Sequence, residues 1–253
     1  MSVQALPTLR MTRKGFRTLT VTQAKLLLRE PAALIWLVLP VAMVVIFGNI
    51  PAFQTAQKTL DGKSVIDVYV PTIAAMVPLF VAFTALPTTM ASFREKGVLR
   101  RLSVSPVPAA GMLAALLAVV AAVAAVGVVL ITSIGALAFD VQAPANLGTV
   151  FVAFLLGSTA VFALGLIVAA LARTAGEASG LGVPLMVLNF FFSGLYFPVA
   201  QMPHVLQRIG EFVPFGAVMA AWAGTGSLWQ HLAVLAAYTV IGSLVAARVF
   251  RWE

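Results

Sequence analysis

Few residues of this 253-residue chain could take part in covalent or metal chemistry. It has no cysteine and two histidines, His204 and His231, which excludes disulfides and thiolate metal sites and leaves little for a histidine metal centre. The stretch DGKS at 61–64 ends like a phosphate-binding loop, but the first glycine of that motif would fall on Gln57. The sequence therefore predicts no catalytic residue, no metal, no cofactor bound by this chain and no ATPase site of its own.

Charge is concentrated instead in the stretch SFREKGVLRRLSVSPV, at 92–107. Four basic side chains and one acidic one occupy eight positions here, although only 9% of the chain is charged. Val98, Leu99 and Leu102 lie at helical spacing and give an apolar flank, and Pro106 limits the helix because the residue before a proline avoids the helical region. We predict a short cytoplasmic helix over 93–105 that docks a soluble partner. The alternative is an ordinary basic loop that only sets topology.

The elements around this stretch are those of a membrane protein. The chain is 61% hydrophobic with a mean hydropathy of +1.04, whereas soluble domains are about a quarter charged. Backbone groups in lipid must bond internally, and the apolar runs lack the alternation of strands, so we expect helices. The predicted fold is an all-α polytopic membrane protein with six transmembrane helices, at 32–50, 68–90, 112–138, 147–171, 181–200 and 229–247.

Basic residues predict the orientation of these helices. Sixteen Lys and Arg are present, and all except Lys58, Lys63 and Arg208 lie in the amino-terminal segment, the 91–111 loop, the 172–180 loop or the carboxyl-terminal tail. Because cytoplasmic loops carry an excess of Lys and Arg, both termini are expected in the cytoplasm. The net charge of +8 therefore indicates cytoplasmic loops and membrane lipid as the partner, and no nucleic acid.

Two further segments differ from the spans. Residues 8–30 mix bases with apolar residues and predict an amphipathic helix at the inner membrane surface, or alternatively a frayed basic tail. Residues 201–228, on the outer side, are interrupted by prolines, and irregular backbone at membrane depth is tolerated only where protein or a cavity shields it. We expect short broken helices there that dip back toward the bilayer.

Two motifs carry a resemblance to a known family. The stretch FREKGVLRRLSVSPV resembles the segment after the second span in ABC-2 type permeases, the membrane subunits of bacterial ABC exporters, especially their drug-resistance branch with the daunorubicin exporter's membrane component. The stretch FFSGLYFPVAQMPHVLQRIGEFVPFG, from Phe191 to Gly216, is similar to the same family's fifth-span signature. With LLREP before the first span, the resemblance covers essentially the whole chain, although the Ala/Val-rich third and fourth spans carry no signature.

The resemblance implies partners and site residues. Two permease copies would pair, as a homodimer or with a related permease, and recruit two cytoplasmic ATPase subunits that bind ATP and Mg. The 93–105 helix would be the coupling element, and the 172–180 loop a second contact. The expected ATPase-coupling residues are Arg94, Glu95, Lys96, Gly97, Arg100, Arg101, Leu102, Arg173 and Glu177.

The same resemblance places the substrate path along the first, second and fifth spans. Aromatic side chains there would offer an apolar surface to substrate, and the alternative for each is core packing or contact with lipid. These are Trp36, Phe190, Phe191, Phe192 and Tyr196. Pro198, Pro203 and Pro214 would belong to an outer gate.

We therefore expect the permease subunit of an ATP-driven exporter of a hydrophobic compound, such as a drug, an antibiotic or a lipid, in the bacterial cytoplasmic (inner) membrane. A first alternative is a non-transporting scaffold or assembly factor that holds a cytoplasmic protein through the 93–105 helix. A second is an energy-independent channel, which is disfavoured because the spans lack a polar stripe to wet a pore.

Overall fold

The computed structural model describes residues 13–29, 31–57, 60, 62–98, 109–142 and 146–249, and within these ranges it is helical without β-strands. The helices are α1 (Arg13–Leu28), α2 (Pro31–Gly48), α3 (Pro51–Gln54), α4 (Val65–Phe80), the π-helix η2 (Val81–Ala85), α5 (Leu86–Glu95), α7 (Ala109–Ala138), α8 (Leu147–Leu171), α9 (Ala175–Phe192), the 3₁₀ helix η3 (Val199–Gln201), α10 (His204–Gly210), α11 (Pro214–Ala223) and α12 (Leu228–Val249).

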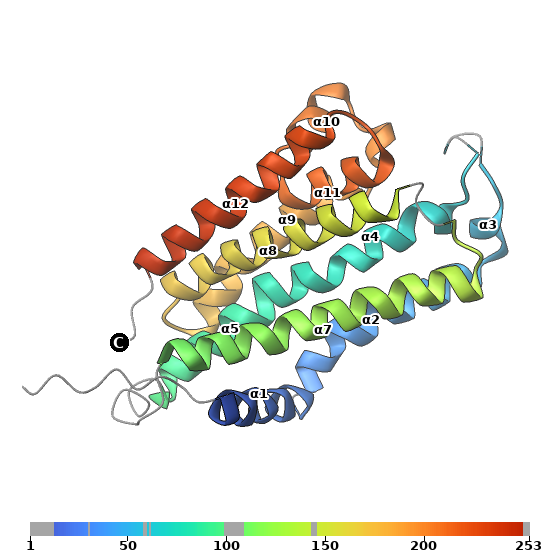
Figure 1. Ribbon diagram of the computed structural model, residues 1–253. Helices are drawn as coiled ribbons and strands as arrows, with labels where there is room; N and C mark the ends of the chain where they lie inside the picture. The colour runs from blue at the N-terminus through green and yellow to red at the C-terminus, as the bar shows by residue number, and fades with distance from the viewer. Residues whose placement is uncertain are drawn as a thin grey trace, which may run out of the picture.

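The long helices run side by side along one axis, and α1 lies across one end of the bundle (Figure 1). We call this end the α1 end; it also holds the end of α5, the α8–α9 turn and the end of α12. The opposite, α3 end holds α3, α10 and the start of α4 (Figure 1).

Five described helices are long and apolar enough to cross a membrane, and the described apolar part of α2, Leu37–Gly48, is shorter. The predicted all-α polytopic membrane fold is confirmed, whereas the count of six spans stays a prediction. The five helices are Val65–Glu95, Gly111–Ala138, Leu147–Leu171, Ala175–Phe192 and Leu228–Val249.

The continuous helix α4–η2–α5 forms the centre of the bundle. It begins with a capping box in which Ser64 and Asp67 satisfy each other's backbone N–H groups. Helices α2 and α7 pack against α4, while α8 and α9 pack against η2 and α5. Ile73, Phe83 and Leu86 of this helix are completely buried, so the helix predicted as the second span is the core around which the others pack.

The π-helix η2 brings this central backbone into direct contact with two glycines. Pro87 has no N–H, so it cannot donate to the carbonyl of Phe83 four residues earlier or to that of Ala82 five residues earlier. A Cβ on Gly165 of α8 would overlap the Ala82 carbonyl oxygen, and a Cβ on Gly182 of α9 would overlap the Phe83 oxygen. Small residues let helix backbones approach closely in membranes, and here they hold α8 and α9 against η2.

Some helix boundaries differ from those that the sequence predicted. Helix α5 continues to Glu95, so residues 93–95 end the central helix and do not begin a separate one. Gly97, at a φ of +63°, then turns the chain. Helix α9 begins earlier than predicted because Thr174 caps it, and it ends at Phe192, where Gly194 adopts a φ of +87°. Residues 201–228, which the sequence predicted as an outer segment, fold into the short helices α10 and α11.

Candidate functional site

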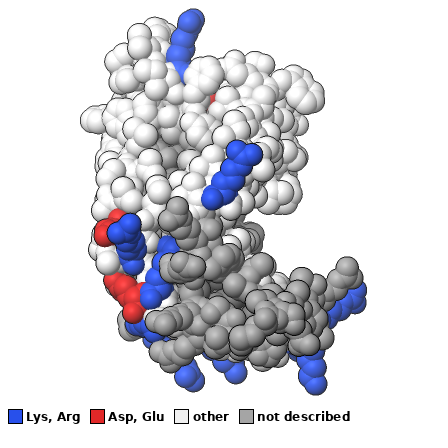
Figure 2. All heavy atoms as spheres, turned by 90° about the vertical axis from the view of Figure 1, so that its left-hand side faces the viewer, with Lys and Arg blue, Asp and Glu red and all other residues white. Residues whose placement is uncertain are grey.

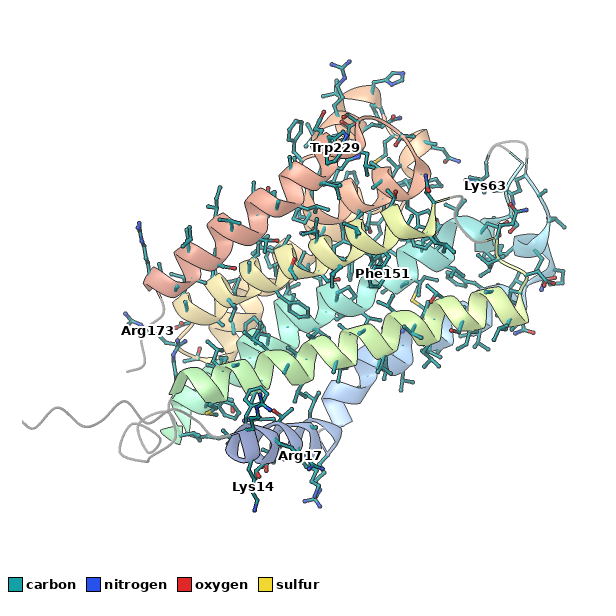
Figure 3. The ribbon with its side chains drawn as sticks, in the orientation of Figure 1. Lys14, Arg17, Lys63, Phe151, Arg173 and Trp229 are labelled. Carbon is teal, nitrogen blue, oxygen red and sulfur yellow. The ribbon has the colours of Figure 1, made fainter. Side chains whose placement is uncertain are left out.

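The α1 end carries most of the described basic residues. Figure 2, which views the molecule from the side of this end, shows Lys and Arg gathered next to Asp and Glu in its lower half. In Figure 3, Lys14 and Arg17 of α1 point away from the bundle, and Arg173 projects at the same end, whereas Lys63 lies at the opposite end. The structure thus separates the basic side chains between two ends as the sequence pattern indicated, and the α1 end is the candidate for partner contact.

Arg94, in the last turn of α5, reaches the carboxyl terminus of α8. Its Nη1 donates hydrogen bonds to the carbonyl oxygens of Ala169 and Ala172, the latter at 2.8 Å. The last carbonyls of a helix lack intrahelical partners, and a cation near them interacts favourably with the helix dipole. Arg94 therefore caps α8 from a neighbouring helix.

Glu95, the next residue, caps α9. Its Oε1 accepts a hydrogen bond from the backbone N–H of Ala175, the first residue of α9, at 3.1 Å. A carboxylate at a helix amino terminus is stabilised by the orphan N–H groups and the dipole. Within the turn itself, Thr174 Oγ1 accepts from the Glu177 N–H at 3.1 Å, and Glu177 Oε2 accepts from the Arg173 N–H at 2.9 Å.

Arg94, Glu95 and residues 172–177 form one unit, which we call the junction. Ala172 of the junction forms a buried cluster with Ala91 and Ala178, and these small side chains let α5 approach the α8–α9 turn closely. The junction brings together the two regions in which the sequence predicted separate partner contacts, because Arg94 and Glu95 lie against the turn that carries Arg173 and Glu177.

Side-chain exposure distinguishes the predicted coupling residues. Glu95, Lys96, Arg173 and Glu177 are exposed, while Arg94 is partly buried. Arg100, Arg101 and Leu102, together with the rest of the predicted 93–105 helix after Val98, lie outside the described residues.

The aromatic residues predicted for the substrate path have different environments. Phe190 is 4% exposed and packs edge-on against Phe80, with ring centroids 5.3 Å apart. Phe192 is also buried and stacks edge-on with the partly buried Phe191 at 5.2 Å. Tyr196 is 48% exposed, and the side chain of Trp36 lies outside the described part. Within this one chain, Phe190 and Phe192 belong to the core.

The three prolines predicted for the outer gate each stand at a helix start. Pro198 precedes η3, Pro203 precedes α10, and Pro214 is the first residue of α11. The start of α11 is held by Asn189 of α9, which is 2% exposed and whose Oδ1 accepts from the Phe215 N–H at 3.3 Å. The polar residue in the fifth span thus anchors the outer segment.

His231 is the polar residue that sequence reasoning left without a role. It is fully buried in the first turn of α12, and neither ring nitrogen has a hydrogen-bond partner among the described residues. Its Nε2 and Glu211 Oε1 flank Gly226, where an added Cβ would lie 3.3 Å and 3.4 Å from them. Burial of this kind leaves no pattern in the sequence. No group of three or more metal-binding side chains occurs in the described part of the chain.

Residues 47–248 match the model of a family described as "ABC-2 family transporter protein". The chain belongs to the ABC-2 transporter family. A protein of Bacillus subtilis (strain 168), named "Putative transport permease YvfS", is 22% identical over 241 residues, which cover 92% of this chain and 95% of the relative. The predicted resemblance to ABC-2 permeases is confirmed, and this ABC-2 protein is the multi-pass membrane subunit of a transporter.

Proposed function

We propose that this chain is the permease subunit of an ATP-driven exporter that moves a hydrophobic compound out of the cytoplasm. A separate cytoplasmic ATPase would bind at the α1 end and drive the transport. The observation that carries the proposal is the junction. At the most strongly basic end of the molecule, two adjacent residues, Arg94 and Glu95, connect the central helix to both α8 and α9.

The junction suits coupling because it connects three membrane-length helices. A partner that pushes on the chain after Gly97 would act on α5, and the capping contacts of Arg94 and Glu95 would pass that displacement to α8 and α9. The contacts of η2 with Gly165 and Gly182 hold the same three helices together deeper in the bundle. This arrangement favours rigid-body switching between two states over bending of a single helix.

ATP and Mg would be held by the partner ATPase, two copies of which would serve two permease copies in a homodimer. The expected cargo is apolar because the aromatic side chains predicted for the path, such as the 48% exposed Tyr196, offer a surface without fixed charge. The proposed orientation places the α1 end in the cytoplasm, in agreement with the excess of basic residues there.

Arg173→Glu tests the proposed contact at an exposed position of the junction. Its side chain is exposed in the α8–α9 turn, so charge reversal should weaken ATPase binding several-fold through repulsion at the interface without removing a buried contact. The permease would be co-expressed with candidate ABC ATPases, and co-purification and ATP hydrolysis in proteoliposomes would be measured. The matched control is Arg208→Glu in α10, an exposed arginine at the opposite end, which should retain full ATPase binding.

Equal ATPase binding by the two variants would contradict the docking site. An ATPase that binds, while its hydrolysis is unaffected by the wild-type permease, would favour the scaffold alternative. Glu95→Lys is a less clean probe than Arg173→Glu, because this substitution also removes the cap of α9. It should be accompanied by Glu95→Gln, which keeps an acceptor oxygen and removes the charge.

A further inference from the structure

A large groove lies between α7 and α8 on the side of the bundle. Its cavity volume is about 560 Å³, within the range of roughly 300–1,000 Å³ that small-molecule sites occupy. Val70 of the central helix, Ala124 and Val150 are buried residues that line it. Phe151 of α8, which is 69% exposed, lies between α8 and α7 in Figure 3. Val129 of α7, which is 63% exposed, also lines the groove.

Small side chains on α7 create this groove. Ala121, Ala124, Ala125, Val128 and Thr132 all line it, at the spacing of one helical face. They belong to the Ala/Val-rich third span, for which the family resemblance offered no motif. Larger side chains at these positions would fill the space between α7 and α8, so the composition of this span has a structural consequence.

The lining of the groove suits an apolar part of a ligand. None of its residues is charged. Among its hydroxyls, Thr132 Oγ1 donates to the Val128 carbonyl at 2.8 Å and Ser158 Oγ donates to the Phe154 carbonyl at 2.7 Å. Hydroxyls that bond their own helix in this way have little need of a ligand acceptor.

The position and length of the groove indicate which apolar ligand it holds. Its lining on α8 runs from Leu147 to Phe162, which corresponds to about 22 Å of helix at 1.5 Å per residue. One leaflet contributes about half of a hydrocarbon core roughly 30 Å thick, so the groove is longer than the depth of one leaflet and has room for an acyl chain of that leaflet. Gln142, whose backbone N–H donates to Asp67 at the start of α4, lies at the α3 end of the groove (Figure 1). Trp222, in the last turn of α11, also lines the groove, and tryptophan is enriched at the level of lipid headgroups.

From this geometry we propose that the groove binds one acyl chain of a phospholipid from the leaflet at the α3 end. The headgroup lies near Gln142 and Trp222, and the chain extends between α7 and α8 over the buried floor at Val70. The site needs only a chain that spans the bilayer, so it does not depend on the proposed ATPase coupling.

The test fills the groove with two leucines. Ala121→Leu/Ala125→Leu adds bulk at two exposed lining positions one helical turn apart. The control, Ala118→Leu/Ala122→Leu, makes the same change at two exposed positions of α7 that do not line the groove. Each full-length protein is purified in mild detergent with dioleoyl phosphatidylglycerol, and native mass spectrometry counts both the retained lipid and the protein copies. We expect several-fold less retained lipid for the groove-filled variant and wild-type retention for the control.

Equal lipid retention in the two double variants would overturn the proposal. So would a groove-filled variant that keeps its lipid but changes from dimer to monomer, because the groove would then be an interface between copies. If the filled variant does not fold, wild-type protein provides a second test. It is placed in nanodiscs that contain a phospholipid with a diazirine on its acyl chain. Photolysis should then place adducts on lining residues such as Val150 and Phe154, and adducts confined to other exposed helix faces would contradict the site.

Discussion

Asn189 illustrates how a polar side chain can serve structure at membrane depth. Its Nδ2 donates to the Leu185 carbonyl of its own helix at 2.9 Å, while its Oδ1 accepts from the start of α11. Both the donor and the acceptor of the amide are therefore hydrogen-bonded, and α9 is fixed to the start of α11.

Replacing Asn189 by leucine should destabilise the protein by about 1–3 kcal/mol, because the buried Phe215 N–H would lose its acceptor. The matched control is Asn49→Leu: Asn49 makes a similar hydrogen bond to the Val45 carbonyl, at 2.8 Å, but is exposed, so its loss should have little effect. Unfolding in detergent, followed by the melting temperature, measures both variants. Equal melting temperatures would contradict the anchoring role of Asn189.

Arg94 and Glu95 show what sequence reasoning could reach at this scale. Their charge, and their position at the end of an apolar run, marked them as residues of a cytoplasmic surface. Their actual partners lie 75 to 80 residues later in the chain, and no local pattern connects positions so far apart. For the same reason the burial of Phe190 could not be told from exposure to a substrate path.

At the scale of elements, η2 and its two glycines set the distance between three helices. Gly165 and Gly182 occupy positions where the carbonyl oxygens of η2 leave no room for a methyl group. The central helix therefore touches α8 and α9 through backbone atoms.

Gly182→Ala should destabilise the bundle by at least about 1–3 kcal/mol, because α9 would have to move away from the Phe83 carbonyl. Gly180→Ala, two residues earlier on the same helix, is the control. Its added Cβ meets nothing within 4 Å, so it should be neutral or stabilise by about 0.5–1 kcal/mol. Thermal unfolding of the two variants, measured side by side, provides the comparison. Similar melting temperatures would show that the close approach at Gly182 is dispensable.

The existence of the long helices could be predicted because length and hydropathy are local properties of the sequence. Their ends were less accessible. The start of α9 depends on capping by Thr174, and the end of α5 on the left-handed conformation of Gly97, and both residues stand in polar stretches that also suit a loop. The π-helix could not be predicted from the single proline that follows it, because prolines in membrane helices more often mark kinks.

For the whole molecule, the charge distribution distinguishes the two ends of the bundle. The end of α5, the α8–α9 turn and the end of α12 lie together with α1, whereas Lys63 and helix α10, which carries Arg208, lie at the opposite end (Figures 1 and 3). A polarity of this kind gives a direct prediction for topology.

The chain contains no cysteine, so single cysteines can report which side of the membrane each end faces. Arg208→Cys should react with a membrane-impermeant maleimide in intact cells. Arg173→Cys should react only after the membrane is permeabilised, because the excess of basic residues at its end predicts a cytoplasmic location. Labelling of Arg173→Cys in intact cells would reverse the orientation and remove the basis for ATPase docking at the junction.

The central position of α4–η2–α5 also has a consequence for biosynthesis. Translation proceeds from the amino terminus, so this helix enters the bilayer before α8 and α9 exist. During that interval neither Gly165 nor Gly182 covers the carbonyls of Ala82 and Phe83, so this part of the central helix contacts lipid instead of α8 and α9. Among the five described membrane-length helices, the most buried one is thus synthesised before two of the helices that cover it. A product truncated before Gly182 would therefore lack the close contact that α9 makes with the Phe83 carbonyl.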